Sequence, residues 1–231
     1  PFEINNSFHY PDYFLIWNNS FKKLLNENNI SKCTKLIVSG SPIHIYKINN
    51  GFTNSFNKTL FSQNKKQLKV LWALTNKSQF NIEIGIIKQY NKNKNIHFII
   101  RNHPNNHINL NEISDSLIPL NHKISSGKSL DQDIIEADIV ICGYASTITF
   151  DAEILGKDSI LMCDDGLKNF VFTTSKGRHY CSNSDEFERI IDNHKKSILL
   201  NDNNLISKAN ELRKKTEYNI DSWRNFISKI D

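Results

Sequence analysis

The sequence predicts an α/β fold with a doubly wound, mostly parallel sheet. Short, continuous apolar runs such as Ile96–Ile100 and Ile139–Cys142 are typical of buried strands, and they recur along the chain. Between them lie stretches such as Gln79–Tyr90, in which apolar residues return at helical spacing. Strands that alternate with helices indicate a parallel sheet, because each helix carries the chain back to the start of the next strand.

The first strand–helix–strand unit lies near the N-terminus. Phe14–Trp17 is a short apolar run, Ser20–Asn28 is amphipathic, and Leu36–Val38 is a second apolar run. We interpret residues 1–48 as the end of a preceding α/β domain. From Asn49 to Lys66 the composition changes to Asn, Ser, Lys, Gly and Phe without periodicity, which predicts a linker at 49–64.

A second unit is expected from residue 65 to residue 200, followed by a helical tail at 201–231. Two helix ends carry clear signals: Ser129 is placed to cap one helix, and Gly156 suits the position just after another. The run Leu117–Leu120 is left unassigned. In chain order, the expected elements are strand Lys69–Leu74, helix Gln79–Tyr90, strand His97–Ile100, helix Ser129–Glu136, strand Ile139–Cys142, helix 147–155, strand Ser159–Met162, helix Asp185–His194 and helix Ile206–Glu217.

Composition and charge exclude several classes of protein. No apolar stretch approaches the roughly 20 residues that a membrane-spanning helix needs. The net charge of +5 comes mainly from dispersed lysines, so no nucleic-acid partner is expected. The four cysteines lack the spacing of a zinc site or a disulfide framework, and a reduced, cytoplasmic protein is expected.

Ligands of parallel sheets bind beyond the carboxyl ends of the strands, so the loops after Leu74, Ile100 and Cys142 are the places to look for function. The first of these loops opens with Thr75.

The loop after Ile100 contains Arg101, His103 and Pro104. Proline disfavours helix at the residue before it, so His103 is expected in an extended conformation at the end of a strand. A histidine presented there can donate to a phosphate, or to a leaving group that gains negative charge. The structural alternative, in which His103 only closes the strand end beside a solvated Arg101, stays open.

The loop after Cys142 reads Gly143-Tyr144-Ala145-Ser146-Thr147 and leads into a helix. Gly143 would let the backbone approach a ligand closely, and backbone N–H groups at the start of a helix attract anions. Ser146 or Thr147 is expected at the cap position of this helix, and Ser146 would equally serve as an ordinary cap without any ligand. Asp151, one turn further on, is placed either to accept hydrogen bonds from ribose hydroxyls or to offset the helix dipole.

These motifs, in this order, resemble the C-terminal half of GT-B glycosyltransferases that build bacterial surface polysaccharide. The likeness is greatest to capsule and lipopolysaccharide enzymes that use CMP-activated sugars, namely Kdo transferases and bacterial sialyltransferases. His103-Pro104 matches the family's His-Pro motif, and Ser146-Thr147 matches its Ser/Thr pair. The resemblance covers about residues 10–165, and most of it lies in Ala137–Lys157. Glycerophosphate polymerases of teichoic acid synthesis share a similar layout.

The resemblance implies a Rossmann-like domain at 65–200 that binds the nucleotide sugar, and an acceptor-side domain that supplies the general base. His103 would assist the departure of CMP, and Ser146 and Thr147 would hold its phosphate, with no metal ion or other cofactor. The tail at 201–231 would pack back across the cleft. The complete nucleotide site is expected to comprise Thr75, Arg101, His103, Pro104, Gly143, Tyr144, Ser146, Thr147 and Asp151. If the two loops meet one phosphate, strands 97–100 and 139–142 must lie close together, both parallel to strand 69–74.

The expected function is transfer of a sugar, a CMP-linked 2-keto sugar acid, onto a bacterial surface glycan. Two alternatives stay open: a CDP-glycerol-type glycerophosphotransferase or UDP-sugar enzyme on the same scaffold, and a nucleotide-binding module without catalysis. The expected partners are the nucleotide-sugar donor and a glycan or lipid-linked glycan acceptor. Lysine pairs such as Lys22-Lys23 are expected to be solvated, with peripheral contact to the inner face of the plasma membrane as the alternative.

Overall fold

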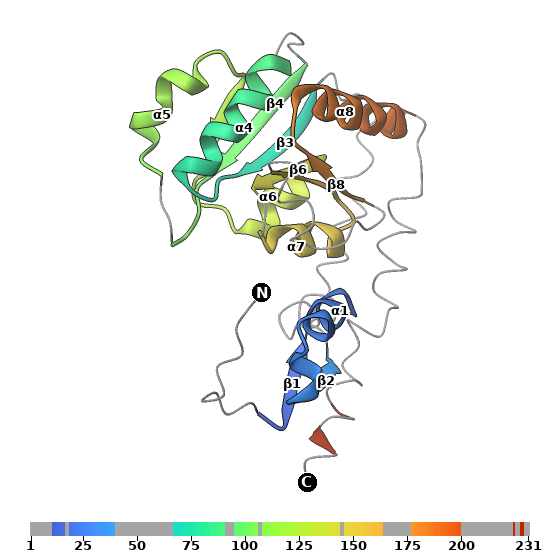
Figure 1. The fold of residues 1–231 in the computed structure, drawn as a ribbon. Helices are drawn as coiled ribbons and strands as arrows, with labels where there is room; N and C mark the ends of the chain where they lie inside the picture. Colours follow the sequence, from blue (N-terminus) through green and yellow to red (C-terminus); the bar gives the residue numbers. More distant parts are fainter. Residues whose placement is uncertain are drawn as a thin grey trace. The chain divides into compact units, whose positions relative to one another are not determined.

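The chain forms two compact units in a computed structural model (Figure 1). One comprises Pro1–Phe52 with Asn210–Asp231, and the other comprises Thr53–Ala209. The predicted linker and the predicted helix Ile206–Glu217 lie outside the described residues. The structure describes residues 11–16, 19–39, 67–90, 95–105, 108–143, 146–163, 177–199, 224 and 227–228.

The described N-terminal part of the first unit is a strand–helix–strand element, as predicted. β1 (Tyr13–Ile16) leads into α1 (Asn19–Glu27), and a short 3-10 helix, η1 (Ile30–Lys32), precedes β2 (Lys35–Val38). The two strands pair in parallel, with Tyr13 opposite Lys35. A parallel pair needs a crossover connection, which α1 and η1 provide.

The second unit contains a six-stranded sheet in which every described pairing is parallel. Its strand order is β5-β4-β3-β6-β7-β8, so the chain builds outward from β3 to β5, returns to the other side of β3, and builds outward to β8. This reversal between β3 and β6 is the mark of a doubly wound sheet. The strands are β3 (Leu68–Ala73), β4 (Ile96–Arg101), β5 (His122–Ile124), β6 (Ile139–Gly143), β7 (Asp158–Met162) and β8 (Arg178–Cys181).

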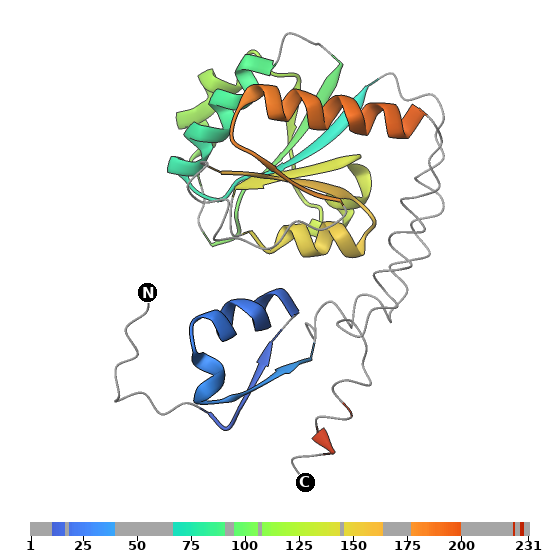
Figure 2. The same ribbon diagram turned by 45° about the vertical axis from the view of Figure 1, so that its right-hand side comes forward.

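Helices cover both faces of this sheet (Figure 2). On one face α4 (Lys77–Tyr90) packs beside α8 (Ser184–Leu199), and on the other α6 (Leu130–Glu136) packs beside α7 (Ile148–Ile154). Residues of α5 (Leu110–Leu117) join the same buried apolar cluster as those of α4 and α8.

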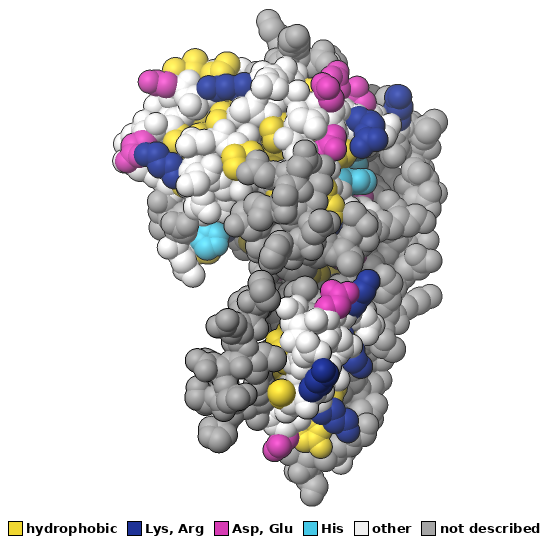
Figure 3. All heavy atoms as spheres, in the orientation of Figure 1, with side chains coloured by type: hydrophobic (Ala, Val, Ile, Leu, Met, Phe, Trp, Pro, Cys, Tyr) yellow, Lys and Arg dark blue, Asp and Glu magenta, His cyan; other side chains and the backbone are white. Residues whose placement is uncertain are grey.

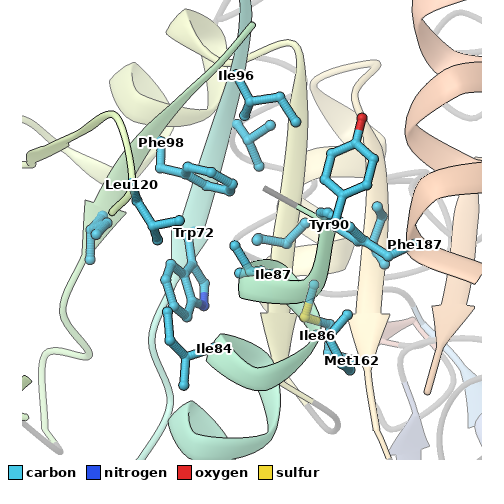
Figure 4. Close-up of a cluster of buried hydrophobic side chains, with 14 of the residues drawn as sticks. Trp72, Ile84, Ile86, Ile87, Tyr90, Ile96, Phe98, Leu120, Met162 and Phe187 are labelled. Atoms are coloured by element: carbon cyan, nitrogen blue, oxygen red, sulfur yellow. The ribbon is translucent and has the colours of Figure 1, made fainter. Parts of the chain in front are cut away.

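The core beneath α4 is rich in aromatic residues (Figure 4). Trp72 of β3 stacks on Phe80 of α4 with ring centroids 5.4 Å apart, and meets Phe98 of β4 edge to face at 6.2 Å. Tyr90 meets Phe187 of α8 edge to face at 5.2 Å. Large rings with fixed geometry hold α4 firmly on the sheet. The loop between β3 and α4 is thereby placed as well.

Most of the predicted elements are present, and the helix signals act as predicted. Ser129 and Gln132 form a reciprocal capping box at the start of α6, and Gly156 follows α7 with a φ of 66°. The sequence does not predict β5, β8 or α5. β5 has three half-buried or exposed residues and β8 reads Arg-His-Tyr-Cys, so neither shows an apolar run. Leu117–Leu120 forms the end of α5 and the turn after it.

Charge is mixed on the described surface. On the face seen in Figure 3, Lys and Arg side chains lie among Asp and Glu side chains rather than in one basic patch. None of the described helices is both long enough and apolar enough to cross a bilayer.

Candidate functional site

The strand order reverses between β3 and β6, and this reversal is where an open parallel sheet binds its ligands. β4 and β6 pair with β3 on its two sides, all in parallel, so their carboxyl ends meet at one edge. Thr75, His103 and Ser146 lie in the three loops that leave this edge. Strands 97–100 and 139–142 do run parallel to 69–74, as predicted, with β3 lying between them.

The loop after β4 is organised by Asn102. Its side-chain oxygen accepts hydrogen bonds from the backbone N–H groups of His103 and Ile108 at 3.1 and 2.9 Å, and its side-chain nitrogen donates to the Ile108 carbonyl at 2.7 Å. Asn102 therefore holds the two ends of the His103 loop together. The sequence motifs did not single out this residue, although Asn is a common organiser of turns.

His103 is half-buried, and the structure indicates which ring nitrogen carries the proton. Its Nδ1 accepts a hydrogen bond from the backbone N–H of Asn105 at 3.1 Å. In the neutral ring the proton must then sit on Nε2. Nε2 has no hydrogen-bond partner among the described residues, so it is available as a donor. Pro104, which follows, is exposed at the start of a bend.

Arg101 ends β4 and is engaged within the fold. Its Nη1 lies 2.6 Å from Oδ2 of Asp133, a fully buried residue of α6, and donates to the Lys128 carbonyl at 2.9 Å. Ser125 also donates to Asp133 Oδ2. Arg101 thus ties the end of β4 to α6. Its predicted contact with a nucleotide stays a prediction.

The loop after β6 is described from Ser146 onward. Thr147, rather than Ser146, holds the cap position of α7, and its exposed side chain makes no capping hydrogen bond. The Ser146 carbonyl accepts from Thr149 Oγ1 at 3.2 Å, and the Ser146 hydroxyl contacts the buried thiol of Cys142. The prediction that Ser146 serves as an ordinary helix cap is therefore wrong, whereas Thr147 holds the cap position. Tyr144 lies outside the described residues, and its role stays a prediction.

Asp151 lies in the first turn of α7, as predicted, and is 8% exposed. A carboxylate this close to a helix N-terminus stabilises the helix through its dipole. Burial at this level favours that structural role over contact with ribose. The proposed ribose contact stays a prediction.

Gly143, the last residue of β6, is required by packing against α4. A Cβ atom there would overlap Gln79 Cγ, and would lie 2.7 Å from Thr75 Oγ1 and 2.9 Å from Glu83 Oε1. Gly143 was expected to admit a ligand, whereas these side chains are what approach it in the structure. We call Thr75, Gln79, Glu83 and Gly143 the Gly143 junction.

Glu83 is the functional candidate that sequence reasoning missed. Its side chain is fully buried, and Oε2 accepts a hydrogen bond from Trp72 Nε1 at 2.5 Å. Burial raises the pKa of Glu83 from 4.5 to about 8, against the opposing effect of hydrogen bonds from Trp72 and Gln79. One signal was present in the sequence: Glu83 lies on the apolar face of α4, at helical spacing from Phe80 and Ile87.

Metal binding finds no support in the part of the chain that the structure describes. There, no three His, Cys, Asp or Glu side chains come together as a metal site would require. The expectation of metal-free chemistry stays a prediction.

The parallel pairing and the strand order define the second unit as a Rossmann-like α/β domain of the doubly wound class, as predicted. No protein-family model matches the chain, and no curated protein matches its sequence.

Several solved structures are similar in fold. One is UDP-GlcNAc 2-epimerase from Neisseria meningitidis bound to UDP-GlcNAc, with 17% identity and a TM-score of 0.51, covering 94% of this chain and 60% of that one. Another is the wall teichoic acid polymerase TagF with CDPG, with 14% identity and a TM-score of 0.49, covering 89% and 51%. A third is Anabaena Alr3699/HepE in complex with UDP-glucose, with 12% identity and a TM-score of 0.44, covering 89% and 63%. The chain thus spans only part of the length of each of these proteins, and at these identities the likeness concerns the fold alone.

Proposed function

We propose that this chain is the nucleotide-sugar-binding part of a GT-B glycosyltransferase that moves a CMP-activated 2-keto sugar acid onto a bacterial surface glycan, free or lipid-linked. The observation that carries the proposal is the position of His103, whose Nε2 is available as a donor at the carboxyl end of β4. The loop with Thr75 leaves the neighbouring strand, and the loop with Ser146 leaves the strand beyond it. The loops that follow three adjacent strands thus leave one edge of the sheet.

The chemistry of such a transfer fits these groups. When the bond between the anomeric carbon and the phosphate oxygen breaks, the electron pair stays on the oxygen and the phosphate gains charge. The Nε2–H of His103 would donate to that phosphate, and the hydroxyls of Ser146 and Thr147 would hold its other oxygens. The Thr75 hydroxyl is buried against Gly143, so its predicted contact with the nucleotide is not part of this proposal. The acceptor hydroxyl attacks the anomeric carbon and gives its proton to a base, which we place in an acceptor-side domain outside residues 65–200.

A UDP-sugar or CDP-glycerol donor on the same scaffold is the second candidate. The similar epimerase structure holds UDP-GlcNAc, which agrees with a nucleotide sugar as the ligand class but favours uridine as the base. A module that binds nucleotide without turnover is the third candidate. The identity of the nucleotide that binds to this chain distinguishes the CMP-sugar candidate from the UDP-sugar or CDP-glycerol candidate.

The test is calorimetric titration of the chain with CMP, CDP and UDP in parallel. We expect CMP to bind, and His103→Ala to lower its affinity by about tenfold or more, because a hydrogen bond to a charged group contributes roughly 1.5–3 kcal/mol. His97→Ala, at the amino end of β4, is the matched control and should bind as the parent does. Equal binding by His103→Ala would overturn the site. Stronger binding of UDP or CDP would change the donor, and no binding of any nucleotide would overturn the proposal.

The same proposal places the chain in the cytoplasm, with peripheral contact to the inner face of the plasma membrane where a lipid-linked acceptor lies. Lys22 and Lys23 of α1 are partly or fully exposed and would contribute to that contact. Cosedimentation with anionic vesicles, lost at high salt, would support it. Absence of cosedimentation at low salt would reject it.

A further inference from the structure

The guanidinium of Arg101 is only partly used by the fold. Its side chain is 27% exposed and stands at the carboxyl end of β4. Nη1 donates to Oδ2 of Asp133 at 2.6 Å and to the Lys128 carbonyl at 2.9 Å. Nε and Nη2 have no hydrogen-bond partner among the described residues, and neither is among the unpaired atoms that are cut off from solvent. The N–H groups of Nε and Nη2 are therefore available to a ligand.

These unused groups have the geometry of a fork. Nε–H and one N–H of Nη2 point the same way along one side of the planar guanidinium, so they can donate to two oxygens of a single anion. An arginine that served only its ion pair would be expected to bind both oxygens of the carboxylate. Asp133 Oδ1 nevertheless has no partner, although it is buried. The fork thus stays open while a carboxylate oxygen within the fold stays unpaired.

Asp133 fixes the position of the guanidinium. It is a fully buried residue of α6, and its Oδ2 also accepts a hydrogen bond from Ser125. The second acceptor of Nη1, the Lys128 carbonyl, lies in the segment between β5 and α6. A side chain that is already held at two points loses little further freedom when it binds a ligand, which favours affinity.

A second arginine of the same unit shows what a structural ion pair looks like in this fold. Arg178, the first residue of β8, pairs with Glu153 of α7 at 2.6 Å, and its side chain is only 5% exposed. Its guanidinium also lies 4.6 Å from the centre of the Phe150 ring. Arg178 is thus enclosed at the amino end of its strand. Arg101 is open at the carboxyl end of its own strand, where parallel sheets bind ligands.

The position of Arg101 beside His103 indicates which anion would meet the fork. The two residues are two positions apart, so their Cα atoms are at most about 7 Å from each other. In a CMP-linked 2-keto sugar acid, the carboxylate is bonded to the anomeric carbon, and this carbon is bonded to the phosphate oxygen. A phosphate bound by His103 therefore brings the carboxylate close to the end of β4. The anomeric carbon of an aldose donor such as UDP-GlcNAc carries a hydrogen instead.

We propose that Arg101 binds the carboxylate of the donor sugar acid through Nε and Nη2, with Asp133 as its positioning residue, and so selects donors that carry this group. The inference rests on the proposed function and names the residue that recognises the sugar. Arg101 then contacts the sugar acid, and the phosphate contacts stay with His103, Ser146 and Thr147.

The test compares two ligands by calorimetric titration of the full chain: CMP, which has no carboxylate, and CMP-N-acetylneuraminic acid, which has one. Arg101→Lys keeps a cation beside Asp133 but has no fork. We expect it to bind CMP within about twofold of the parent, and to bind CMP-N-acetylneuraminic acid about tenfold or more weakly than the parent. Arg178→Lys is the matched control and should keep both affinities, because Arg178 lies at the opposite edge of the sheet.

Variants of Asp133 separate positioning from support of the fold. Asp133→Ala removes the acceptor of Nη1, so affinity for CMP-N-acetylneuraminic acid should fall several-fold while affinity for CMP is kept. Asp133→Asn retains an oxygen that accepts from Nη1 and should restore the parent ratio of the two affinities. A purely structural role would weaken both ligands together. Equal ratios in Asp133→Ala and the parent would reject the positioning role.

The outcomes distinguish this inference from the proposed function. If the parent binds neither ligand, the proposed function fails. If the parent binds both and Arg101→Lys weakens both equally, or neither, this inference fails and the proposed function stands. A parent that binds CMP alone would contradict the sugar-acid donor and this inference, and would leave the nucleotide site in place. If Arg101→Lys does not fold, Arg101→Gln combined with Asp133→Asn makes the same comparison with an uncharged pair.

Discussion

Trp72 and Glu83 are joined by a hydrogen bond of 2.5 Å from the indole Nε1 to the carboxyl Oε2, and both side chains are buried in the core (Figure 4 shows Trp72). The bond links the central strand of the sheet to the helix that covers it. It also holds the carboxyl group of Glu83 in a buried environment that favours the neutral form. This arrangement has a consequence for stability that needs no ligand to observe.

The free energy of unfolding should depend on pH through Glu83. The ordinary pKa of a glutamate side chain is 4.5, whereas the pKa of Glu83 in the folded chain is about 8. The folded state therefore binds more protons between these values, so the stabilisation is complete below pH 4.5 and is lost as pH rises through about 8. The full change is on the order of a few kcal/mol. Urea unfolding at pH 5, 7 and 9 should show the parent losing stability relative to Glu83→Gln; parallel profiles would contradict a raised pKa.

Gly143→Ala should destabilise the second unit by roughly 1–3 kcal/mol, because the new methyl group overlaps Gln79, Thr75 and Glu83. Gly85→Ala is the matched control on α4. Nothing lies within 4 Å of its Cβ position, and alanine favours helix, so it should stabilise by about 1 kcal/mol. Thermal and urea unfolding of the two variants give the comparison. Equal free energies of unfolding for the two variants would mean that the side chains of α4 do not pack closely against Gly143.

Arg101→Ala should lower the free energy of unfolding by roughly 3–5 kcal/mol, since it leaves Asp133 as a buried, unpaired charge. Adding Asp133→Asn removes that charge and should restore part of the loss. The measurement is urea unfolding of both variants. A stable Arg101→Ala variant with weakened nucleotide binding would instead assign the guanidinium to the ligand.

Thr147→Ala should lower nucleotide affinity by about tenfold and leave the melting temperature unchanged, because its hydroxyl makes no capping hydrogen bond in the fold. Thr149→Val offers the opposite case. It removes a hydroxyl that donates to the Ser146 carbonyl from a fully buried position, and should cost about 1 kcal/mol of stability. Nucleotide titration and thermal melting of the two variants distinguish a hydroxyl that binds nucleotide from one that stabilises the fold. A loss of stability in Thr147→Ala would show that the cap forms in solution.

The sequence predicts the centre of the sheet well and its edges poorly. β3 and β6 are buried on both faces, so their continuous apolar runs can be recognised directly. β5 and β8 lie at the two edges, where half-exposed residues such as His122 and His179 replace that run. α5 carries a helical spacing at Leu110, Ile113 and Leu117 and an Asn109 cap, so a closer reading of the sequence would have found it.

In the candidate site, too, some features follow from local sequence, whereas others depend on contacts between residues that are far apart in the chain. Chain order and the rule for parallel sheets are enough to place His103 and Ser146 at one edge. The protonated nitrogen of His103 depends on a contact with Asn105, and the engagement of Arg101 depends on Asp133, 32 positions away. Burial of Glu83 depends on which face α4 turns to the sheet. Periodicity indicates that face, but not that an acid on it would be tolerated.

Lys69 and Asp138 close the amino end of the pairing between β3 and β6, with hydrogen bonds of 2.9 and 2.8 Å between residues 69 positions apart. β3 and β4, by contrast, follow one another along the chain. On the ribosome, the segment with Thr75 and His103 therefore emerges and can pair before the segment with Ser146 has been synthesised. Closing the longer loop costs more chain entropy and is the slower step. During refolding, nucleotide binding would thus appear only when β6 pairs with β3, after the first half of the sheet has formed. The rate at which binding appears would then report the rate of that pairing.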